Sequence, residues 1–208
     1  MDSLEAFILA GGASSRMGTD KSRLLLGGQT FTERIANTLL TVASTVTLVG
    51  RSSDNPHFRS AEDVYPQWGA LGGLHAALSA CSADWAIVVA CDLPFVSRAL
   101  FVRLASVRGD FAAVAPVQKD GRPQPLCAIY RVSPCLAMAE KLIQSGERRP
   151  GTLLQSVRTR WMAFNELADL RGANRFFDNL NTPDDYARAQ LNGESLQTEG
   201  LNGSEFKP

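Results

Sequence analysis

The sequence has few of the residues on which metal-centred and disulfide-stabilised proteins depend. Its 208 residues include four cysteines and two histidines, and no two cysteines form a C-x-x-C pair. This excludes a zinc knuckle and a thioredoxin-like motif, and scattered cysteines in a chain of this length are typical of buried thiols in a reducing compartment. A histidine-rich metal site is excluded as well. We interpret His57, in a polar loop, and His75, on a predicted helix, as solvated side chains without a catalytic role.

An excess of charge of either sign and a long apolar run are also missing. The 21 basic and 21 acidic side chains give a formal net charge of zero at pH 7, so broad attraction to nucleic acid or to an anionic membrane is not expected. No apolar stretch reaches the ~20 residues of a membrane span. The first residues, MDSLEAFILAGG, lack the basic start and the long apolar run of a secretory signal. The sequence therefore predicts a cytoplasmic protein that binds an anionic ligand only through local charges.

The chain does have a regular alternation of short apolar runs and amphipathic segments. Apolar runs predict strands at residues 5–10, 45–50, 84–90, 111–117 and 125–131. Helical spacing and capping residues predict helices at 31–40, 70–81, 98–107, 135–146, 150–157 and 183–190. This alternation predicts one α/β domain over residues 1–191, Rossmann-like and three-layered, with a mostly parallel sheet covered on both faces. Residues 192–208, which are rich in Gly, Ser and Glu, are expected to form a disordered tail.

The glycine-rich stretch after the first predicted strand is the strongest functional signal. In α/β folds of this kind, ligands bind beyond the carboxyl ends of the strands. The Walker A pattern is absent, because two residues separate the glycine of MGTDK from its lysine. The dinucleotide pattern G-x-G-x-x-G is absent too, because the glycines of LAGG are adjacent. Residues 9–21 fit a third pattern, L-A-G-G-x-x-x-R-M-G-x-D-K, without a gap.

The residue types in this stretch suit a ligand that carries phosphates. The adjacent Gly11 and Gly12 let backbone N–H groups approach a base or a phosphate, and consecutive N–H groups form an anion-binding nest. The guanidinium of Arg16 can hold phosphate oxygens in its fork, and the ammonium of Lys21 can neutralise charge. The alternative is a glycine-rich turn with two solvated cations.

Residues 9–21 resemble the signature of the molybdenum cofactor guanylyltransferases, a family of nucleotidyltransferases with the nucleotide-diphosphosugar-transferase fold. Four later segments resemble this family in the same order: GALGGL (69–74), VVACDLPF (88–95), GERRPG (146–151) and NLNTPDD (179–185). Two positions depart from the family's pattern. Ala70 stands where the family has a proline, which loosens the turn, and Gly50 stands where an asparagine contacts the nucleotide.

The resemblance implies which residues do the chemistry. Catalytic roles fall on Arg16, Lys21 and Asp92. Nucleotide binding falls on Leu9, Ala10, Gly11, Gly12, Lys21, Asp63 and Asp92.

The residues themselves give reasons for the two aspartates. Asp92 follows a predicted strand and precedes Pro94, so it lies on the ligand side of the sheet. A hard carboxylate there, opposite a triphosphate, suits Mg²⁺. The alternative role, capping the next helix, belongs better to Ser97. Asp63 can accept from N1 and N2 of guanine together, but a solvated loop acid is an equal alternative.

In the family that the sequence resembles, the nucleotide is transferred to the phosphate of molybdopterin. This acceptor needs anion-binding groups of its own, since the protein has no general positive field. Arg148 and Arg149 lie just after one predicted helix and just before the predicted helix at 150–157, at whose start N–H groups also face outward. Asn179 and Asn181 would share one face of an extended segment, and their amides can bind a phosphate, a pterin or Mg²⁺. The alternatives are solvated arginines and an asparagine that caps the last helix.

The predicted reaction is transfer of GMP from GTP to the phosphate of molybdopterin, with Mg²⁺ as cofactor and pyrophosphate released. Molybdoenzymes and other cofactor-biosynthesis proteins are candidate partners. Three alternatives are a cytidylyltransferase acting on the same cofactor, a sugar-1-phosphate nucleotidyltransferase, and a GTP-binding adaptor without activity. The AGG sequence of the loop speaks against the first, and the short chain against the second. Retention of Arg16, Lys21 and Asp92 together speaks against the third.

Overall fold

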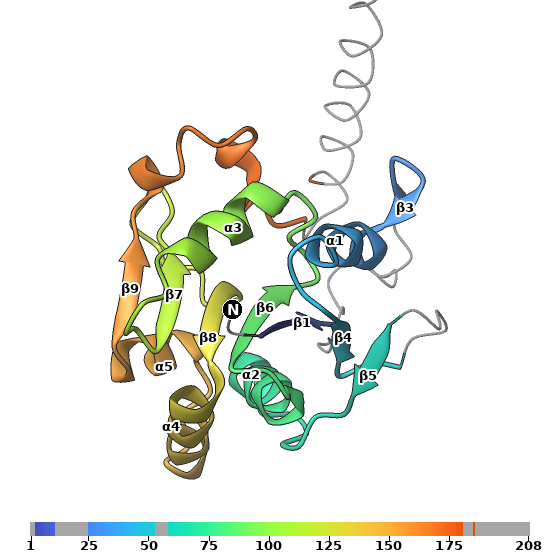
Figure 1. Cartoon of the computed structure of the whole chain (residues 1–208). Helices are drawn as coiled ribbons and strands as arrows, with labels where there is room; N and C mark the ends of the chain where they lie inside the picture. The colour runs from blue at the N-terminus through green and yellow to red at the C-terminus, as the bar shows by residue number, and fades with distance from the viewer. Residues whose placement is uncertain (1–2, 11–24, 53–57, 181–184, 186–208) are drawn as a thin grey trace, which may run out of the picture.

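The centre of the molecule is a seven-stranded sheet with the strand order β5-β4-β1-β6-β8-β7-β9. The computed structural model (Figure 1) describes residues 3–10, 25–52, 58–180 and 185. The strands are β1 (Leu4–Leu9), β4 (Val46–Val49), β5 (Arg59–Ala61), β6 (Trp85–Ala90), β7 (Ala113–Pro116), β8 (Cys127–Arg131) and β9 (Thr159–Met162). Strand β8 runs antiparallel to both of its neighbours, whereas the other pairs in the sheet are parallel. The prediction of a mostly parallel sheet is confirmed.

Helices cover both faces of this sheet, which confirms the three-layer prediction (Figure 1). The helices are α1 (Phe31–Leu39), α2 (Gly69–Ala80), α3 (Arg98–Ser106), α4 (Val132–Gln144) and α5 (Pro150–Ser156). Buried residues of α1 and α3 share one apolar cluster with the sheet, and those of α2, α4 and α5 share the other. The short helices η2 (Phe164–Glu166) and η3 (Ala173–Arg175) lie with α1 and α3, and a small hairpin of β2 (Leu25–Leu26) and β3 (Gln29–Thr30) precedes α1. Among the described residues, none of the helices has the length and apolar character needed to cross a bilayer.

The apolar runs of the sequence form the strands that are buried on both faces. In β1, the side chain of Ile8 packs into the cluster beneath α1 and α3, whereas Phe7 and Leu9 pack beneath α2. This alternation is the two-residue period of a strand, and Phe7 and Ile8 are both fully buried. A strand covered on both faces therefore reads as an uninterrupted apolar run, as in FIL and AIVVA.

Helix ends mostly follow the local signals in the sequence. The hydroxyl of Ser97 accepts from the N–H of Leu100 at 3.3 Å, which confirms the predicted cap of α3. Gly146 has a φ of +87° two residues after the end of α4, as predicted for the residue that ends this helix. Helix α4, however, begins at Val132 instead of residue 135. Pro134 fits in its first turn, because the N–H groups there have no partner within the helix.

The carboxyl ends of four parallel strands are joined along one edge of the sheet by backbone hydrogen bonds. The N–H of Ala10 donates to the carbonyl of Val49 at 3.0 Å, and the N–H of Gly50 donates to that of Ala61 at 3.0 Å. The N–H of Cys91 donates to the carbonyl of Leu9 at 3.2 Å. The segments that leave β1, β4, β5 and β6 therefore start side by side, at the edge where a ligand is expected.

Candidate active site

The site is built on this carboxyl edge, and Asp92 lies at its centre. Asp92 is half-buried and follows the end of β6 by two residues. Its carbonyl accepts from the N–H of Leu180 at 3.1 Å. The buried side chain of Leu180 packs with Leu26, Phe31 and half-buried Phe95. The segment that contains Asn179 is therefore fixed beside the aspartate predicted to hold Mg²⁺.

Asp63 lies on the same edge, two residues beyond β5. Its half-buried side chain faces the first turns of α2: an oxygen of its carboxylate lies 4.0 Å from the position that a Cβ on Gly73 would occupy. A methyl carbon of Leu9 is 3.4 Å from the same position. Helix α2 thus presents bare backbone to the end of β1 at this point, and the carboxylate of Asp63 lies alongside.

Five of the predicted site residues lie outside the described residues: Gly11, Gly12, Arg16 and Lys21, predicted for catalysis or nucleotide binding, and Asn181, predicted for acceptor binding. Asn179 is described and exposed, but it lies in an irregular segment instead of a strand. The alternation of side chains that was expected for an extended strand therefore does not apply to it. The predicted helix at 183–190 is described only at residue 185, which is helical.

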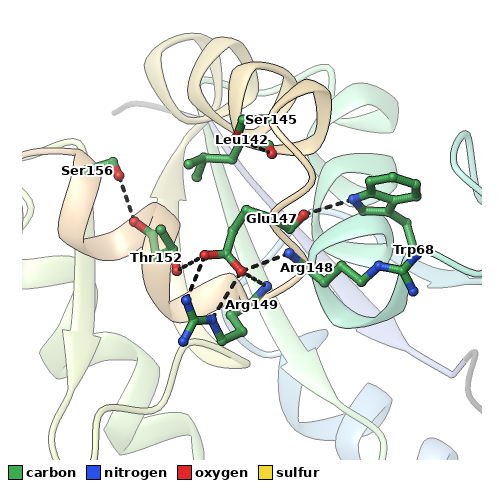
Figure 2. Close-up of polar contacts among 8 residues, drawn as sticks. All are labelled: Trp68, Leu142, Ser145, Glu147, Arg148, Arg149, Thr152 and Ser156. Carbon is green, nitrogen blue, oxygen red and sulfur yellow. Dashed lines mark hydrogen bonds and ion pairs between the residues drawn. The ribbon is translucent and has the colours of Figure 1, made fainter.

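Glu147 organises the loop that carries the two predicted acceptor arginines (Figure 2). Its carboxylate accepts the backbone N–H groups of Arg148 and Arg149 at 2.9 and 3.0 Å and the hydroxyl of Thr152 at 2.8 Å. It also binds the guanidinium of Arg149 through both oxygens, at 3.1 and 3.0 Å. These donors hold the pKa of Glu147 well below its usual range, the side-chain bond to Arg149 having the largest effect. The backbone N–H groups of Arg148 and Arg149 are therefore occupied by this carboxylate.

Trp68 links this loop to α2, and nothing in the sequence pattern pointed to it. Its indole N–H donates to the carbonyl of Glu147 at 2.8 Å, and the guanidinium carbon of Arg148 lies 4.8 Å from the centre of its ring. The close approach depends on Gly72, because a Cβ there would lie 2.8 Å from the Cβ of Trp68. Gly69 has a φ of +67° where α2 begins, so the glycines of GALGG set the path of the chain at this point.

The carboxylates at this edge of the sheet suit Mg²⁺ that is also bound by phosphates. Within the part of the chain that the structure describes, no group of three or more His, Cys, Asp or Glu side chains could hold a metal ion. A dedicated protein cage is therefore not formed by these residues. One carboxylate at the end of a strand, Asp92, fits the habit of Mg²⁺, which binds one or two carboxylates together with substrate phosphates and water.

The interpretation of His75 as a solvated side chain is wrong. The residue is 3% exposed, on the face of α2 that packs against α4. Its Nε2 lies 3.7 Å from an oxygen of Glu140, its Nδ1 lies 3.4 Å from the hydroxyl of Ser79, and the ring of Tyr65 meets it edge-on. Burial lowers the pKa of His75, with Glu140 acting in the opposite direction. The sequence missed this burial because a polar residue on an apolar helix face was taken as facing water.

The cysteines are free thiols, and two of them are buried, Cys127 and Cys135. Burial raises the pKa of Cys135 to about 12 and that of Cys127 further, so neither forms a thiolate near neutral pH. Cys81 is half-buried, and burial raises its pKa to about 12. Together these values give no sign of thiol chemistry at the three positions.

An open cavity of about 350 Å³ lies between α1 and the start of α3 and does not include a predicted site residue. It is lined by Arg34, Thr38, Val96, Arg98 and three further polar residues of this region. The Nε–H of Arg34 donates to the carbonyl of Pro94 at 2.9 Å. This side chain therefore supports the loop after Asp92 from α1.

Solved nucleotidyltransferase structures share this fold. Molybdopterin-guanine dinucleotide biosynthesis protein A from Archaeoglobus fulgidus has a TM-score of 0.78 and 24% identity, over 92% of this chain and 99% of that one. The 2-C-methyl-D-erythritol 4-phosphate cytidylyltransferase of Thermus thermophilus has a TM-score of 0.67 and 16% identity, over 93% and 100%. At such identities the likeness defines the fold, which is the α/β fold of nucleotidyltransferases.

Sequence comparison narrows this class to a family. Residues 6–160 match the MobA-like NTP transferase domain, and the chain belongs to this family. A probable molybdenum cofactor guanylyltransferase of Clostridium perfringens is 32% identical over 186 residues, which cover 87% of this chain and 93% of that protein. The molybdenum cofactor guanylyltransferase of Desulfosudis oleivorans is 28% identical over 195 residues, which cover 91% and 96%.

Proposed function

We propose that this protein transfers GMP from GTP to the phosphate of molybdopterin and releases pyrophosphate. The observation that carries the proposal is the meeting of Leu9, Asp63 and Asp92 on one sheet edge in a chain of this family. An oxygen of the acceptor phosphate attacks the α-phosphorus of GTP. The bond from that phosphorus to the bridging oxygen breaks, and pyrophosphate leaves with the electron pair. The acceptor phosphate is already ionised at neutral pH, so the step needs positioning and charge neutralisation more than a protein base.

The donor half of the proposed site binds the nucleotide. Leu9 and Ala10 lie at the end of β1, directly before Gly11 and Gly12. The N–H groups of these two glycines are proposed to contact the base and phosphates. Asp63 is proposed to accept from N1 and N2 of guanine.

Charge at the reacting phosphate is handled by three side chains in this proposal. Asp92 is the residue that would hold Mg²⁺, which when bound would neutralise charge on the phosphates. Arg16 and Lys21 add positive charge to the triphosphate, with the arginine acting as a fork and the lysine as a point charge.

The acceptor half is proposed to lie in the loop of Arg148 and Arg149 and in the segment of Asn179 and Asn181. The hydrogen bond from Leu180 to the carbonyl of Asp92 supports this assignment, because it holds the second segment against the donor half. We propose further that the catalytic unit spans residues 1–191 and works in the cytoplasm, where molybdoenzymes and other cofactor-biosynthesis proteins would be its partners.

The activity is tested by incubating the purified protein with Mg²⁺, molybdopterin and each nucleoside triphosphate in turn, and measuring the pyrophosphate released. We expect release with GTP. Calorimetric titration should show GTP binding more than about tenfold tighter than CTP, because a polar site disfavours a ligand that leaves its groups unpaired. Equal or tighter CTP binding would contradict the guanylyl assignment. GTP binding without pyrophosphate release would indicate a nucleotide-binding adaptor.

The variant Asn181→Ala distinguishes the donor half of the site from the acceptor half. This variant should bind GTP within a few-fold of the wild type, while transfer to molybdopterin falls sharply. Transfer at the wild-type rate would place the acceptor site elsewhere. A collapse of GTP binding would assign Asn181 to the donor half.

A further inference from the structure

Trp68 lies at the junction of the two proposed halves of the site. It directly precedes α2, the helix whose Gly73 faces Leu9 and Asp63. Its indole N–H reaches the carbonyl of Glu147, 79 residues further along the chain, at 2.8 Å. Figure 2 shows the indole beside the loop of residues 147–149, with the side chain of Arg148 against it. A single side chain thus connects the start of α2 to the loop proposed to bind the acceptor.

The two arginines of this loop are held in different ways. Arg149 presents the edge of its guanidinium to Glu147, and two of its nitrogens lie within 3.1 Å of the carboxylate oxygens. Its charge is therefore paired within the loop. Arg148 instead places its guanidinium over the ring of Trp68, with 4.8 Å between the guanidinium carbon and the ring centre. Among the described residues, no carboxylate lies within ion-pair distance of Arg148.

This difference decides which arginine can bind an anion. A guanidinium is flat, and its N–H donors point outward around its perimeter. A cation–π contact with an aromatic ring occupies no acceptor atom, so the donors that point away from the ring stay available. Pairing with a carboxylate, as in Arg149, uses the donors themselves. Arg148 therefore keeps the donors that a phosphate needs, whereas Arg149 commits them to Glu147.

We propose that Trp68 is a positioning residue that holds the guanidinium of Arg148 ready for the phosphate of the acceptor. The proposal rests on the acceptor half of the proposed function and adds a division of labour to it: Arg148 binds the acceptor, and Arg149 with Glu147 fixes the loop. Binding then costs less conformational entropy, because a long side chain is ordered before the acceptor arrives.

The surroundings of Trp68 are built to keep the indole in place. The indole N–H of Trp68 donates to the carbonyl of Glu147, and its backbone N–H donates to the carbonyl of Tyr65 at 3.2 Å. Gly72 leaves the space that the Cβ of Trp68 occupies. Gln67, the residue before it, has a φ of +64°, a conformation that non-glycine residues seldom adopt. The chain thus makes a constrained turn directly before this side chain.

The test is a double-mutant cycle with Trp68→Ala, Arg148→Ala and the double variant. Molybdopterin binding is measured by calorimetry without GTP, and transfer kinetics are measured in parallel. Trp68→Ala should weaken molybdopterin binding about fivefold, the scale of a cation–π contact at an accessible site together with lost ordering, and leave the KM for GTP within about twofold. Arg148→Ala should weaken it more. Adding Trp68→Ala to Arg148→Ala should cost nothing further, because Trp68 acts through Arg148.

Two further variants serve as controls. Arg131→Ala removes an exposed arginine at the opposite edge of the sheet, where β8 ends, and should leave molybdopterin binding unchanged. Trp68→Phe keeps an aromatic face and loses the indole N–H, so it should weaken binding by about twofold, less than Trp68→Ala does. It also replaces Trp68→Ala if that variant fails to fold.

The outcomes separate this inference from the proposed function. Additive losses in the cycle, or an equal rise in the KM for GTP, would overturn the role of Trp68 even if GMP transfer is observed. Coupled losses in molybdopterin binding, without GMP transfer by the wild type, would support Trp68 and contradict the proposed reaction. No molybdopterin binding by the wild type would overturn both.

Discussion

The N–H of Cys91 donates to the carbonyl of Leu9 at 3.2 Å, and this bond joins the first residue after β6 to the last residue of β1. The next residue, Asp92, accepts from Leu180 through its carbonyl at 3.1 Å. Three segments that are far apart in the sequence therefore meet through backbone hydrogen bonds. The site is positioned by the paired sheet, so side chains there can be changed without loss of the framework.

Asp92→Asn is expected to remove turnover and to leave the nucleotide bound. The carboxylate is proposed to hold Mg²⁺ against charge that grows in the transition state, and loss of one such group lowers the rate by about 10²–10³. Pyrophosphate release at saturating GTP measures the rate, and calorimetry measures GTP affinity. The unfolding midpoint of the variant, measured in parallel, separates a loss of turnover from a loss of fold. Wild-type turnover at limiting Mg²⁺ would contradict the role.

Lys21→Ala is expected to weaken GTP binding itself. Its ammonium is proposed to meet phosphates that are already charged in the ground state, so the loss appears in affinity and not only in rate. A charge-assisted contact of this kind corresponds to about a tenfold rise in the dissociation constant. Lys141→Ala, which removes an exposed lysine of α4, serves as the control. An unchanged dissociation constant in Lys21→Ala would make Lys21 a surface lysine.

Gly72 and Gly73 provide a matched pair on α2. Alanine at either position favours the helix by about 1 kcal/mol. At Gly72 the new Cβ would lie 2.8 Å from the Cβ of Trp68 and 3.1 Å from the carbonyl oxygen of Tyr65. Such overpacking costs about 1–3 kcal/mol. At Gly73 the closest atom is a methyl carbon of Leu9 at 3.4 Å, an ordinary contact.

Gly72→Ala should therefore lower the free energy of unfolding, and Gly73→Ala should leave it unchanged or raise it. Urea unfolding at pH 8 measures both. Gly72→Ala should also weaken molybdopterin binding, because Trp68 must move. Equal stability of the two variants would show that the loop before α2 relaxes around the added methyl group.

Much of the architecture could be predicted because its signals are local. Strands buried on both faces produce the uninterrupted runs FIL and AIVVA, and Ser97 and Gly146 begin or end helices by capping within a few residues. The predicted helix began at residue 135, after Pro134, although a proline is tolerated in a first turn. That error concerns only the first three residues of the helix.

The site divides in the same way between local and long-range information. Asp63 and Asp92 were predicted from motif positions: Asp92 follows a predicted strand, whereas Asp63 was assigned in a loop by the resemblance alone. Trp68 was missed, because its contacts with Glu147 and Arg148 lie 79 and 80 residues away and leave no periodic pattern. His75 was misjudged for a related reason. Its burial depends on the packing of α4 against α2, and α4 begins more than 50 residues later in the sequence.

The buried His75 predicts a specific dependence of stability on pH. Burial lowers its pKa in the folded protein, so the imidazole is neutral where the unfolded chain, with a pKa of about 6.5, begins to bind a proton. The groups that face it are the carboxylate of Glu140, the hydroxyl of Ser79 and the ring of Tyr65. Glu140 opposes the shift but does not reverse it.

Proton linkage fixes the direction in which His75 changes the free energy of unfolding with pH. Where the unfolded state binds more protons than the folded state, the free energy of unfolding rises with pH. The contribution of His75 is therefore fully present above the unfolded pKa and is lost as the pH falls below it, until the folded imidazole also titrates. The slope for one proton is at most about 1.4 kcal/mol per pH unit. The contributions of carboxylates with lowered pKa values, such as Glu147 and Glu166, are constant near neutral pH and are lost only at more acid pH.

Urea unfolding between pH 7.5 and 5.5 isolates this contribution. The wild type should lose stability steadily as the pH falls through this range. His75→Gln should be less stable at pH 7.5, since it disturbs the packing of α2 against α4, but its stability should change less between the two pH values. His57→Gln removes the other histidine and keeps His75, so it should retain the wild-type slope. If His75→Gln keeps the full slope while His57→Gln loses it, the burial of His75 does not control the acid sensitivity of the fold.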